Sequence, residues 1–400
     1  MLDKAFRLMR RREMRRMLGM SHAPGETQYD ELLAHNATSR TFPGLLGVAM
    51  GDLKASTTRL LSPQRSRNVD HPLTPHFLGK GINPVVFDWA RRGPLDLYRY
   101  EDVFMLAEGG MVTIFRGQTV DTESTGLSRA VNELGNVAPV HVARGAYIDD
   151  IYRPTNPCHF MVDRLPRAFH YTRLADIAMS ECITVNATSE YPLYALERVA
   201  PEIRRLDPLT LYHFDELFVL STCARPIGHP FFFLDREVID FVVPAMTAEL
   251  PAPSRRRRIY LSRFASERRK LINEKKIADA LEERGFEILE MSDFSPRDQL
   301  AAVREAELVV APHGAALANL VGATPHNRVI ELFNPRRGTA AYGAMAIAVG
   351  APYTPLFGTP QDRRKLDDPW LIDPARVVAA IDNAPTWAGS GAGVAQGGKD

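Results

Sequence analysis

The chain has 400 residues, of which 45% are hydrophobic and 24% are charged, a balance typical of a soluble globular protein with two or three domains. That composition excludes collagen, long coiled coils and wholesale disorder. The 49 basic residues nearly cancel the 48 acidic ones, so no nucleic acid is expected as a partner.

The cysteines and the apolar segments indicate the cellular compartment of the protein. Cys158, Cys182 and Cys223 are odd in number and widely spaced, which gives neither a disulfide framework nor a CxxC metal site. No apolar run approaches the roughly 18 residues that cross a bilayer, and residues 1–20 lack the apolar stretch of a secretory signal. These features predict a cytoplasmic protein.

Residues 1–80 are predicted to form a basic N-terminal arm and an irregular lead-in. Residues 1–20 carry seven basic side chains against Asp3 and Glu13. Two interpretations fit them: a solvated helix, favoured because Glu13 interrupts the apolar face, or a weak peripheral contact with the inner membrane face. Residues 21–80 show no sustained hydrophobic period, which indicates irregular structure.

Residues 81–250 show a weak alternation of apolar strands and helical segments. Apolar stretches at 102–106, 111–115 and 217–220 alternate with a helical segment at 160–174. We therefore expect a first α/β domain of Rossmann-like type. The Pro-Ala-Pro-Ser segment at 251–254 then predicts a stiff linker.

Residues 251–384 show the same alternation more sharply, with Gly285 and Gly350 as helix stops and Ser295 as a helix N-cap. Strands are predicted at 259–261, 286–289, 308–311, 329–333 and 353–357, and helices at 273–284, 295–306, 313–320 and 340–349. This spacing favours a parallel sheet covered on both faces, hence a second Rossmann-like domain. The tail, 385–400, is predicted to be disordered.

The segment 311–319 is the most informative part of the chain. It runs from an apolar strand into a helix, and it holds His313, Gly314 and Ala315 at the turn and Asn319 at its end. Ligands of parallel α/β sheets bind at such strand ends, and a helix N-terminus offers N–H groups to a phosphate. The alternative is a tight turn whose histidine caps the helix.

Basic residues concentrate just upstream, with ten between Arg255 and Lys276. Arg263 follows the first strand of the second half, at the same end of the sheet as His313. We therefore favour an anion site for Arg263 and Arg269, because a guanidinium can hold diphosphate oxygens in bidentate geometry. For 255–258 a solvated charged face is favoured.

Three further acidic or histidine positions have two interpretations each. Glu331 lies inside an apolar strand, where its carboxylate needs a partner: a sugar hydroxyl or a structural group. His159 and Asp163 are four residues apart, and they are either a general base pair or a structural pair. The acids at 149–150 and 367–368 are either metal ligands for a nucleotide sugar or exposed loop acids, and the second interpretation is favoured, so no metal site is expected.

Segments 260–263, 269–274, 309–319 and 329–332 together resemble the signature of glycosyltransferase family 61. The resemblance covers about 255–360 and extends to 155–170, where His159 and 165–167 are similar to a family segment. It implies a GT-B architecture, in which two Rossmann-like domains face a cleft. The nucleotide sugar then binds the second domain and the acceptor binds the first.

The resemblance also assigns residues. It implies donor binding by Arg263, Arg269, Asn273, the turn at 313–315 and Glu331. The spacing after Arg263 departs from the family pattern, so either Arg268 or Arg269 meets the phosphate. The chain has no N-terminal anchor of the Golgi kind, which favours a bacterial cytoplasmic enzyme.

The sequence thus predicts an inverting, metal-independent glycosyltransferase of surface polysaccharide assembly, without a cofactor. Its expected partners are a nucleoside diphosphate sugar, with a UDP-sugar expected, and a carbohydrate acceptor, with His159 or Asp163 as the base. Two alternatives stand beside it: a non-catalytic subunit that binds a sugar nucleotide, and a transferase of pyruvyl or phosphate-linked sugar groups on the same architecture.

Overall fold

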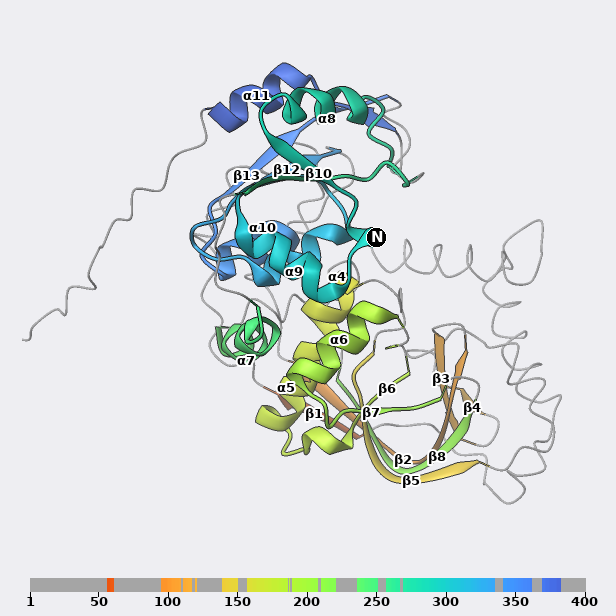
Figure 1. Cartoon of the computed structure of the whole chain (residues 1–400). Coiled ribbons are helices and arrows are strands. Elements are labelled where there is room, and N and C mark those ends of the chain that lie inside the picture. Colours follow the sequence, from red (N-terminus) through yellow and green to blue (C-terminus); the bar gives the residue numbers. More distant parts are fainter. Residues whose placement is uncertain are drawn as a thin grey trace, which may run out of the picture. The chain divides into compact units, whose positions relative to one another are not determined.

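A computed structural model describes the chain over 56–60, 95–108, 111–116, 119–120, 139–149, 157–185, 187, 189–207, 210–220, 236–250, 257–266, 269–334, 341–361 and 369–382. These residues belong to two compact units, which meet along the chain between Val238 and Ile239, inside α7 (Arg236–Thr247) (Figure 1). The basic arm predicted at 1–20, the linker at 251–254 and the tail lie outside the described residues. Of the lead-in predicted to be irregular, the structure describes only 56–60, and these residues form a strand instead.

The first unit holds a mixed sheet of order β4-β3-β2-β8-β5-β6-β7, with β1 paired to β2. Its strands are β1 (Ser56–Leu60), β2 (Leu95–Glu108), β3 (Met111–Arg116), β4 (Thr119–Val120), β5 (Val140–Tyr147), β6 (Cys182–Thr184), β7 (Arg204–Arg205) and β8 (Leu211–Leu220). The pairs β5–β8, β5–β6 and β6–β7 are parallel, and β1 to β4 pair antiparallel, as do β2 and β8.

This sheet differs from the all-parallel arrangement that a Rossmann-like domain would have. Only Gly109 and Gly110 separate β2 from β3, and a connection of two residues can join only antiparallel strands. The alternation of strands and helices therefore begins after β5. Buried side chains of β2, β5, β6 and β8, among them Val103, Val142, Ile183 and Phe214, form the core of this unit.

The helices of the first unit are α4 (Pro157–His159), the π-helix η6 (Phe160–Arg164), α5 (Leu165–Leu174), η7 (Met179–Glu181) and α6 (Glu190–Val199). One buried hydroxyl fixes α5 to the sheet. Tyr171 donates to the carbonyl oxygen of Tyr147 at 2.8 Å and accepts from the backbone N–H of Leu220 at 2.6 Å. The helix is thereby attached to the ends of β5 and β8.

The second unit is built on a parallel sheet of order β10-β9-β11-β12-β13. Its strands are β9 (Arg257–Leu261), β10 (Phe286–Leu289), β11 (Ala306–Pro312), β12 (Arg328–Phe333) and β13 (Tyr353–Phe357), and β14 (Thr359–Pro360) pairs with β15 (Trp370–Leu371) beside it. The predicted strands of this half are confirmed.

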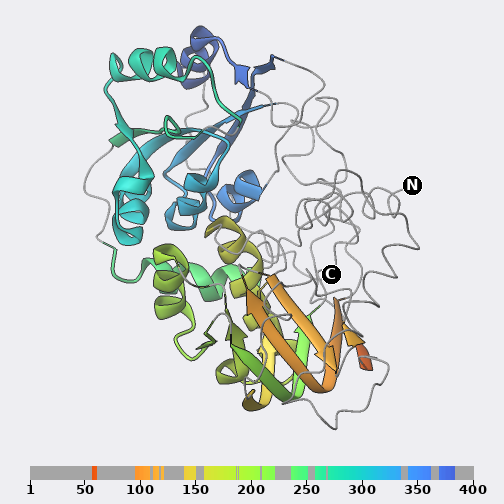
Figure 2. The same ribbon diagram turned by 90° about the vertical axis from the view of Figure 1, so that its right-hand side faces the viewer.

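Helices cover both faces of this second sheet, as expected (Figure 2). They are α8 (Glu274–Glu282), α9 (Pro296–Glu305), α10 (Ala341–Ala348) and α11 (Pro374–Asp382), with the short helices η9 (Met291–Asp293) and η10 (Ala315–Gly322). Apolar side chains of α8 and α11, including Ile277, Leu281, Val377 and Ile381, pack with Tyr260, Val310 and Ile330 of the sheet.

Local signals account for the helix ends. Ser295 caps α9, since its side chain accepts from the backbone N–H of Asp298, and Pro296 occupies the first helical position. Gly285 and Gly350 follow α8 and α10 with φ of 77° and 82°, values that favour glycine. The helix predicted at 313–320 differs: it is a 3-10 helix and begins at Ala315, after an extended Gly314.

Among the helices that the structure describes, none is both long and apolar enough to span a membrane.

Candidate functional site

The strand-end residues Arg263 and His313 lie together in the second unit. Strands β9 and β11 are parallel neighbours, with Tyr260 beside Val310, so their carboxyl ends meet at one edge of the sheet. Beyond these ends, Nη1 of Arg263 donates to the backbone oxygen of His313 at 2.6 Å. The structure thus brings together the two residues on which the sequence prediction rests.

Gly314 makes room for this contact. A Cβ at Gly314 would lie 3.0 Å from both Cδ and Nε of Arg263, closer than side chains normally pack. The backbone of Gly314 is extended, with φ of −179°, so space and not conformation requires glycine here. The other terminal nitrogen of Arg263, Nη2, donates to Oγ of Ser266 at 2.8 Å, which fixes the plane of the guanidinium.

A buried carboxylate, Glu274, orders the loop that carries Arg263. Its Oε1 accepts from the backbone N–H of Arg263 at 2.6 Å and from the hydroxyl of Tyr260 at 3.2 Å. Burial raises the pKa of Glu274, and these two hydrogen bonds oppose the rise. Burial also lowers the pKa of Arg263, although the charge of Glu274 acts in the other direction. The guanidinium is therefore a desolvated cation, a strong attractor of anions.

Glu331 of β12 holds the imidazole of His313 through its Nδ1 atom. Nδ1 of His313 lies 2.5 Å from Oε1 of Glu331, whose side chain is fully buried. An ionised carboxylate can only accept, so Nδ1 carries the proton and Nε2 of a neutral ring has the lone pair. The hydroxyl of Tyr353 donates to Oε2 at 2.6 Å. Both oxygens of Glu331 have protein partners, which favours the structural interpretation of this acid.

Aromatic rings fix the plane of the His313 imidazole. The ring of Phe333 stacks on it at a centroid distance of 5.0 Å, and the ring of Tyr342 meets it edge-on at 5.2 Å. Burial, with the charge of Glu331 adding to it, raises the pKa of Tyr353 well above its usual value. Tyr353, Tyr342 and Phe333 have no motif around them, so sequence reasoning did not single them out.

Asn273 binds another part of the chain. Its Nδ2 donates to the backbone oxygen of Ile372 at 2.7 Å, and its Oδ1 accepts from the backbone N–H of Ile372 at 3.3 Å. The indole N–H of Trp370 donates to the backbone oxygen of Arg269 at 2.9 Å, and Arg269 has a φ of 54°. These contacts attach the loop before α8 to the segment around β15. Arg268 lies outside the described residues.

Asn319 and Ala315 belong to η10. Nδ2 of Asn319 donates to Oε1 of Gln299 and to the backbone oxygen of Ala316, both at 2.9 Å. Asn319 is buried and links η10 to α9. Ala315 is the exposed first residue of the helix, so its backbone N–H belongs to the first turn, where no intrahelical partner exists. Ala315 thus lies next to the Arg263–His313 contact. The hydrogen bonds of Asn319 instead hold η10 against α9.

Strands β9 and β11 also carry the predicted charged face. Arg257 donates to Glu287 at 2.8 Å, and Arg258 donates to Glu307 at 2.7 Å. Exposed pairs of this kind contribute little to stability. The side chain of Arg258 is 43% exposed, which agrees with the solvated interpretation, whereas that of Arg257 is only 20% exposed. Arg255 and Arg256 lie outside the described residues.

The base candidates of the first unit lie on a helix of unusual form. The backbone of His159 ends α4 and that of Asp163 belongs to η6, whose π-type hydrogen bonds run from residue i to i+5. The side chains of His159 and Asp163 lie outside the described part of the chain. Short π segments occur frequently at functional sites, and this segment precedes α5 directly.

Asp149 corrects one prediction, because it is not an exposed loop acid. It is 2% exposed, and it accepts from the hydroxyl of Thr184 at 2.8 Å and from the backbone N–H of Val185 at 2.7 Å. Asp149 follows β5 and Thr184 ends β6, so the parallel pairing of these strands places both residues at one edge. Asp150 and the acids at 367–368 lie outside the described residues.

Two buried arginines of the α5 region accompany Asp149. Nε of Arg164 lies 3.8 Å from its carboxylate, and Nη1 of Arg167 donates to its backbone oxygen at 2.9 Å. Within the described chain, Nε and Nη2 of Arg167 have no hydrogen-bond partner. Unsatisfied buried donors are uncommon. The first unit therefore also gathers charge at the carboxyl ends of parallel strands.

The family model described as Glycosyltransferase 61 matches residues 158–330. It takes in α5, β8 and the Arg263–His313 pair, and it ends one residue before Glu331. The match confirms the resemblance found in the sequence and indicates a glycosyltransferase. No curated protein matches the chain closely enough to count as a relative.

Proposed function

Because residues 158–330 belong to glycosyltransferase family 61, we propose that the chain is an inverting, metal-independent glycosyltransferase. It moves a sugar from a nucleoside diphosphate sugar, with a UDP-sugar expected, to a carbohydrate acceptor in surface polysaccharide assembly. The second unit binds the donor and the first unit binds the acceptor, in the two-domain manner that the family resemblance implies.

The contact between Arg263 and the backbone of His313 carries this proposal. In the reaction, the acceptor oxygen attacks the anomeric carbon while the bond from that carbon to the diphosphate oxygen breaks. The leaving diphosphate gains negative charge, and the desolvated guanidinium of Arg263 stabilises it. The N–H groups of the first turn of η10, from Ala315 onward, act at the same place.

His313 supplies a positioned imidazole beside this cation. Its Nδ1 is held by Glu331, and Glu331 is held by Tyr353, so the tautomer that leaves Nε2 as an acceptor is favoured. An acceptor nitrogen at a donor site suits a ribose or sugar hydroxyl. Glu331 and Tyr353 therefore act through His313 as positioning residues.

On the acceptor side, we assign the base to Asp163 or His159. The base takes the proton of the attacking hydroxyl as the new glycosidic bond forms, and a single displacement of this kind inverts the anomeric centre. Support comes from their residue types and from the π segment that carries Asp163. Arg164, the last residue of that segment, lies 3.8 Å from the buried carboxylate of Asp149.

A thermal-shift screen of the full chain against UDP-, GDP- and dTDP-sugars tests donor binding, with a CMP-sugar as a control that lacks a diphosphate. A donor at 100 times its Kd stabilises the fold by about 2.7 kcal/mol. We expect one diphosphate sugar to raise the melting temperature and to be hydrolysed or transferred. No shift with any of them contradicts the proposal, and a shift without transfer or hydrolysis indicates the non-catalytic alternative.

A further inference from the structure

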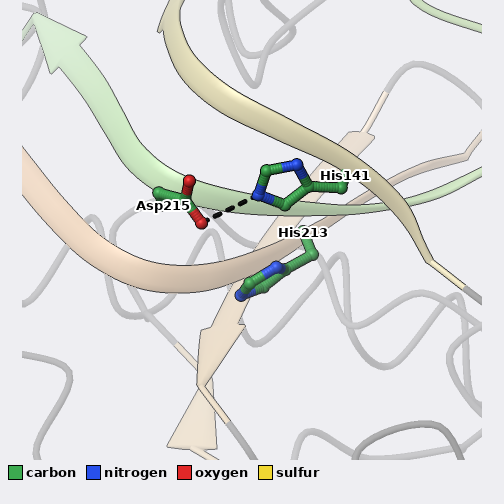
Figure 3. A group of neighbouring side chains, drawn as sticks. All are labelled: His141, His213 and Asp215. Atoms are coloured by element: carbon green, nitrogen blue, oxygen red, sulfur yellow. Dashed lines mark hydrogen bonds and ion pairs between the residues drawn. The ribbon is translucent and has the colours of Figure 1, made fainter.

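A cluster of metal-ligating side chains lies on the sheet of the first unit, away from the residues discussed above. It consists of His141 on β5 and of His213 and Asp215 on β8 (Figure 3). One ligand atom from each lies within 4.8 Å of the others. His141 and His213 are direct partners in the parallel ladder, and their rings are 5.7 Å apart. We call these three residues the His-Asp cluster.

The cluster projects from the face of the sheet opposite the core. Val142 and Phe214, which alternate with its members along β5 and β8, belong to the buried core. The side chains of His141 and Asp215 are 60% and 53% exposed. An ion in solution can therefore reach the ligand atoms without any movement of the fold.

A second carboxylate, Asp102 of β2, completes the arrangement. Its Oδ1 lies 2.8 Å from Nε2 of His213. The ladder pairs Glu101 with Glu216 and Val103 with Phe214, which places Asp102 opposite Asp215. Asp102 has a φ of 52°, a left-handed conformation that aspartate adopts more readily than most residues other than glycine.

We propose that the His-Asp cluster is a site for a divalent transition-metal ion of the zinc class. Two imidazoles and a carboxylate are the ligands that zinc takes in proteins, at about 2.0–2.2 Å each. Two such ligands on one ion lie roughly 3–4 Å apart, and Nε2 of His141 and Oδ1 of Asp215 are already 2.9 Å apart. Mg²⁺ and Ca²⁺ prefer sites made of oxygen atoms alone.

The charges of the cluster support a bound cation. Like charges directly opposite one another in a sheet are destabilising, and Asp102 and Asp215 hold such positions. An ion between His141, His213 and Asp215 offsets that repulsion. In the proposed site Asp102 accepts the Nε2 proton of His213, from which it lies 2.8 Å, and Nδ1 of that ring coordinates the ion, as in other carboxylate–histidine–metal arrangements. Asp102 is thus a positioning residue.

This site is independent of the proposed transfer reaction. Its residues belong to the first unit, whereas Arg263 and His313 belong to the second. The leaving-group chemistry proposed above uses no metal ion. The zinc site would therefore stand if the proposed glycosyl transfer failed, and its test needs no activity assay.

The test is calorimetric titration of zinc chloride into the full chain, prepared without a histidine tag and freed of metal. We expect one saturable site in the wild type and a Kd at least tenfold weaker in His141→Gln and in Asp215→Asn. His326→Gln is the matched control, because His326 is an exposed histidine of the second unit, and it should bind zinc like the wild type.

A cobalt absorption spectrum and a melting measurement distinguish the proposed site from nonspecific zinc binding. Cobalt bound in place of zinc should give the visible absorption of a site with few ligands, and His141→Gln should abolish it. Asp102→Asn should weaken zinc binding about 10–100-fold, and because it removes one of two opposed charges the metal-free variant should melt no lower than the wild type. The proposal is overturned if the wild type does not bind zinc, or if His141→Gln and Asp215→Asn bind it unchanged.

Discussion

The hydroxyl of Tyr353 donates a hydrogen bond of 2.6 Å to Oε2 of Glu331. The other oxygen of that carboxylate meets Nδ1 of His313, so one fully buried acid joins β13 to the turn after β11. A buried carboxylate persists only where partners compensate for its desolvation. Here one partner lies on β13 and the other is the histidine of the candidate site, in the turn after β11.

This relationship predicts unequal losses of stability. Tyr353→Phe removes one hydrogen bond and should lower the free energy of unfolding by about 1 kcal/mol. Glu331→Ala leaves two buried donors without partners and should lower it by about 2–5 kcal/mol. Urea unfolding of the two variants measures both values. Equal small losses would contradict the buried relay from Tyr353 to His313.

Arg263→Ala should impair catalysis and leave the fold intact. Loss of a preorganised donor to the departing diphosphate costs about 2–4 kcal/mol in the transition state, which is roughly a 30-fold to 1,000-fold fall in kcat/KM. Arg258→Ala is the matched control, because Arg258 lies on β9, shortly before Arg263 in the chain, and its exposed side chain pairs with Glu307. Near-normal donor hydrolysis or transfer in Arg263→Ala removes this residue from the mechanism.

Gly314→Ala should act on the same guanidinium by steric displacement. The new Cβ would lie 3.0 Å from Cδ and Nε of Arg263, so the arginine side chain must shift by a few tenths of an ångström, which disturbs its hydrogen bond to the His313 oxygen. Small displacements of positioned groups are expensive, and we expect kcat/KM to fall roughly tenfold to a hundredfold.

Gly285→Ala is the control for a glycine substitution in the same unit. Nothing lies within 4 Å of the added Cβ, but φ is +77°, which should lower stability by about 1–2 kcal/mol. Donor KM should stay unchanged, because Gly285 ends α8 away from the candidate site. Equal kinetic losses in both variants would show that Gly314 acts only through stability.

Excess EDTA should leave the rate of sugar transfer unchanged. The proposed mechanism stabilises the leaving group with Arg263 and backbone N–H groups, and no metal ion takes part. The initial rate with and without chelator is the measurement, with added Mn²⁺ as a reference. Complete loss of activity in EDTA would refute metal-independent transfer, and it would leave the zinc titration of the His-Asp cluster as a separate question.

The thiol of Cys182 gives a prediction about pH. Burial, with the charge of Glu181 adding to it, raises the pKa of this thiol to about 12. The unfolded chain releases the thiol proton from about pH 9 and the folded chain does so only near pH 12. Stability therefore falls as the pH rises between these values. Cys182 should resist iodoacetamide at pH 9 in the native protein and react in urea, as peptide mass spectrometry would detect.

Sequence reasoning predicted the second unit well because its signals are local. The strand at Phe286–Leu289, the cap at Ser295 and the stop at Gly350 each depend on neighbours along the chain. The positions of Arg263 and His313 followed from them, since parallel strands share one carboxyl edge. The role of this edge in donor binding stays a prediction.

What sequence reasoning missed depends on contacts between distant residues. Asp149 looks like a loop acid until Thr184, 35 residues away, becomes its partner. The pairing of β2 with β8 spans more than a hundred residues, and no local period signals it. Within eight residues, a 3-10 helix such as η10 and an α-helix have similar apolar spacing, which explains the difference after Gly314.

The π-helix η6 makes this part of the chain tolerant of a change in its length. A π turn holds one residue more than an α turn, so removing one residue from Phe160–Arg164 would restore a regular helix. The turn absorbs the difference, so the residues on either side keep their angle about the helix axis. Cys158, which is buried, would stay in its packing position. A one-residue deletion inside α5 has no such turn and rotates everything on one side by about 100°, so it should harm the protein more than a deletion in η6.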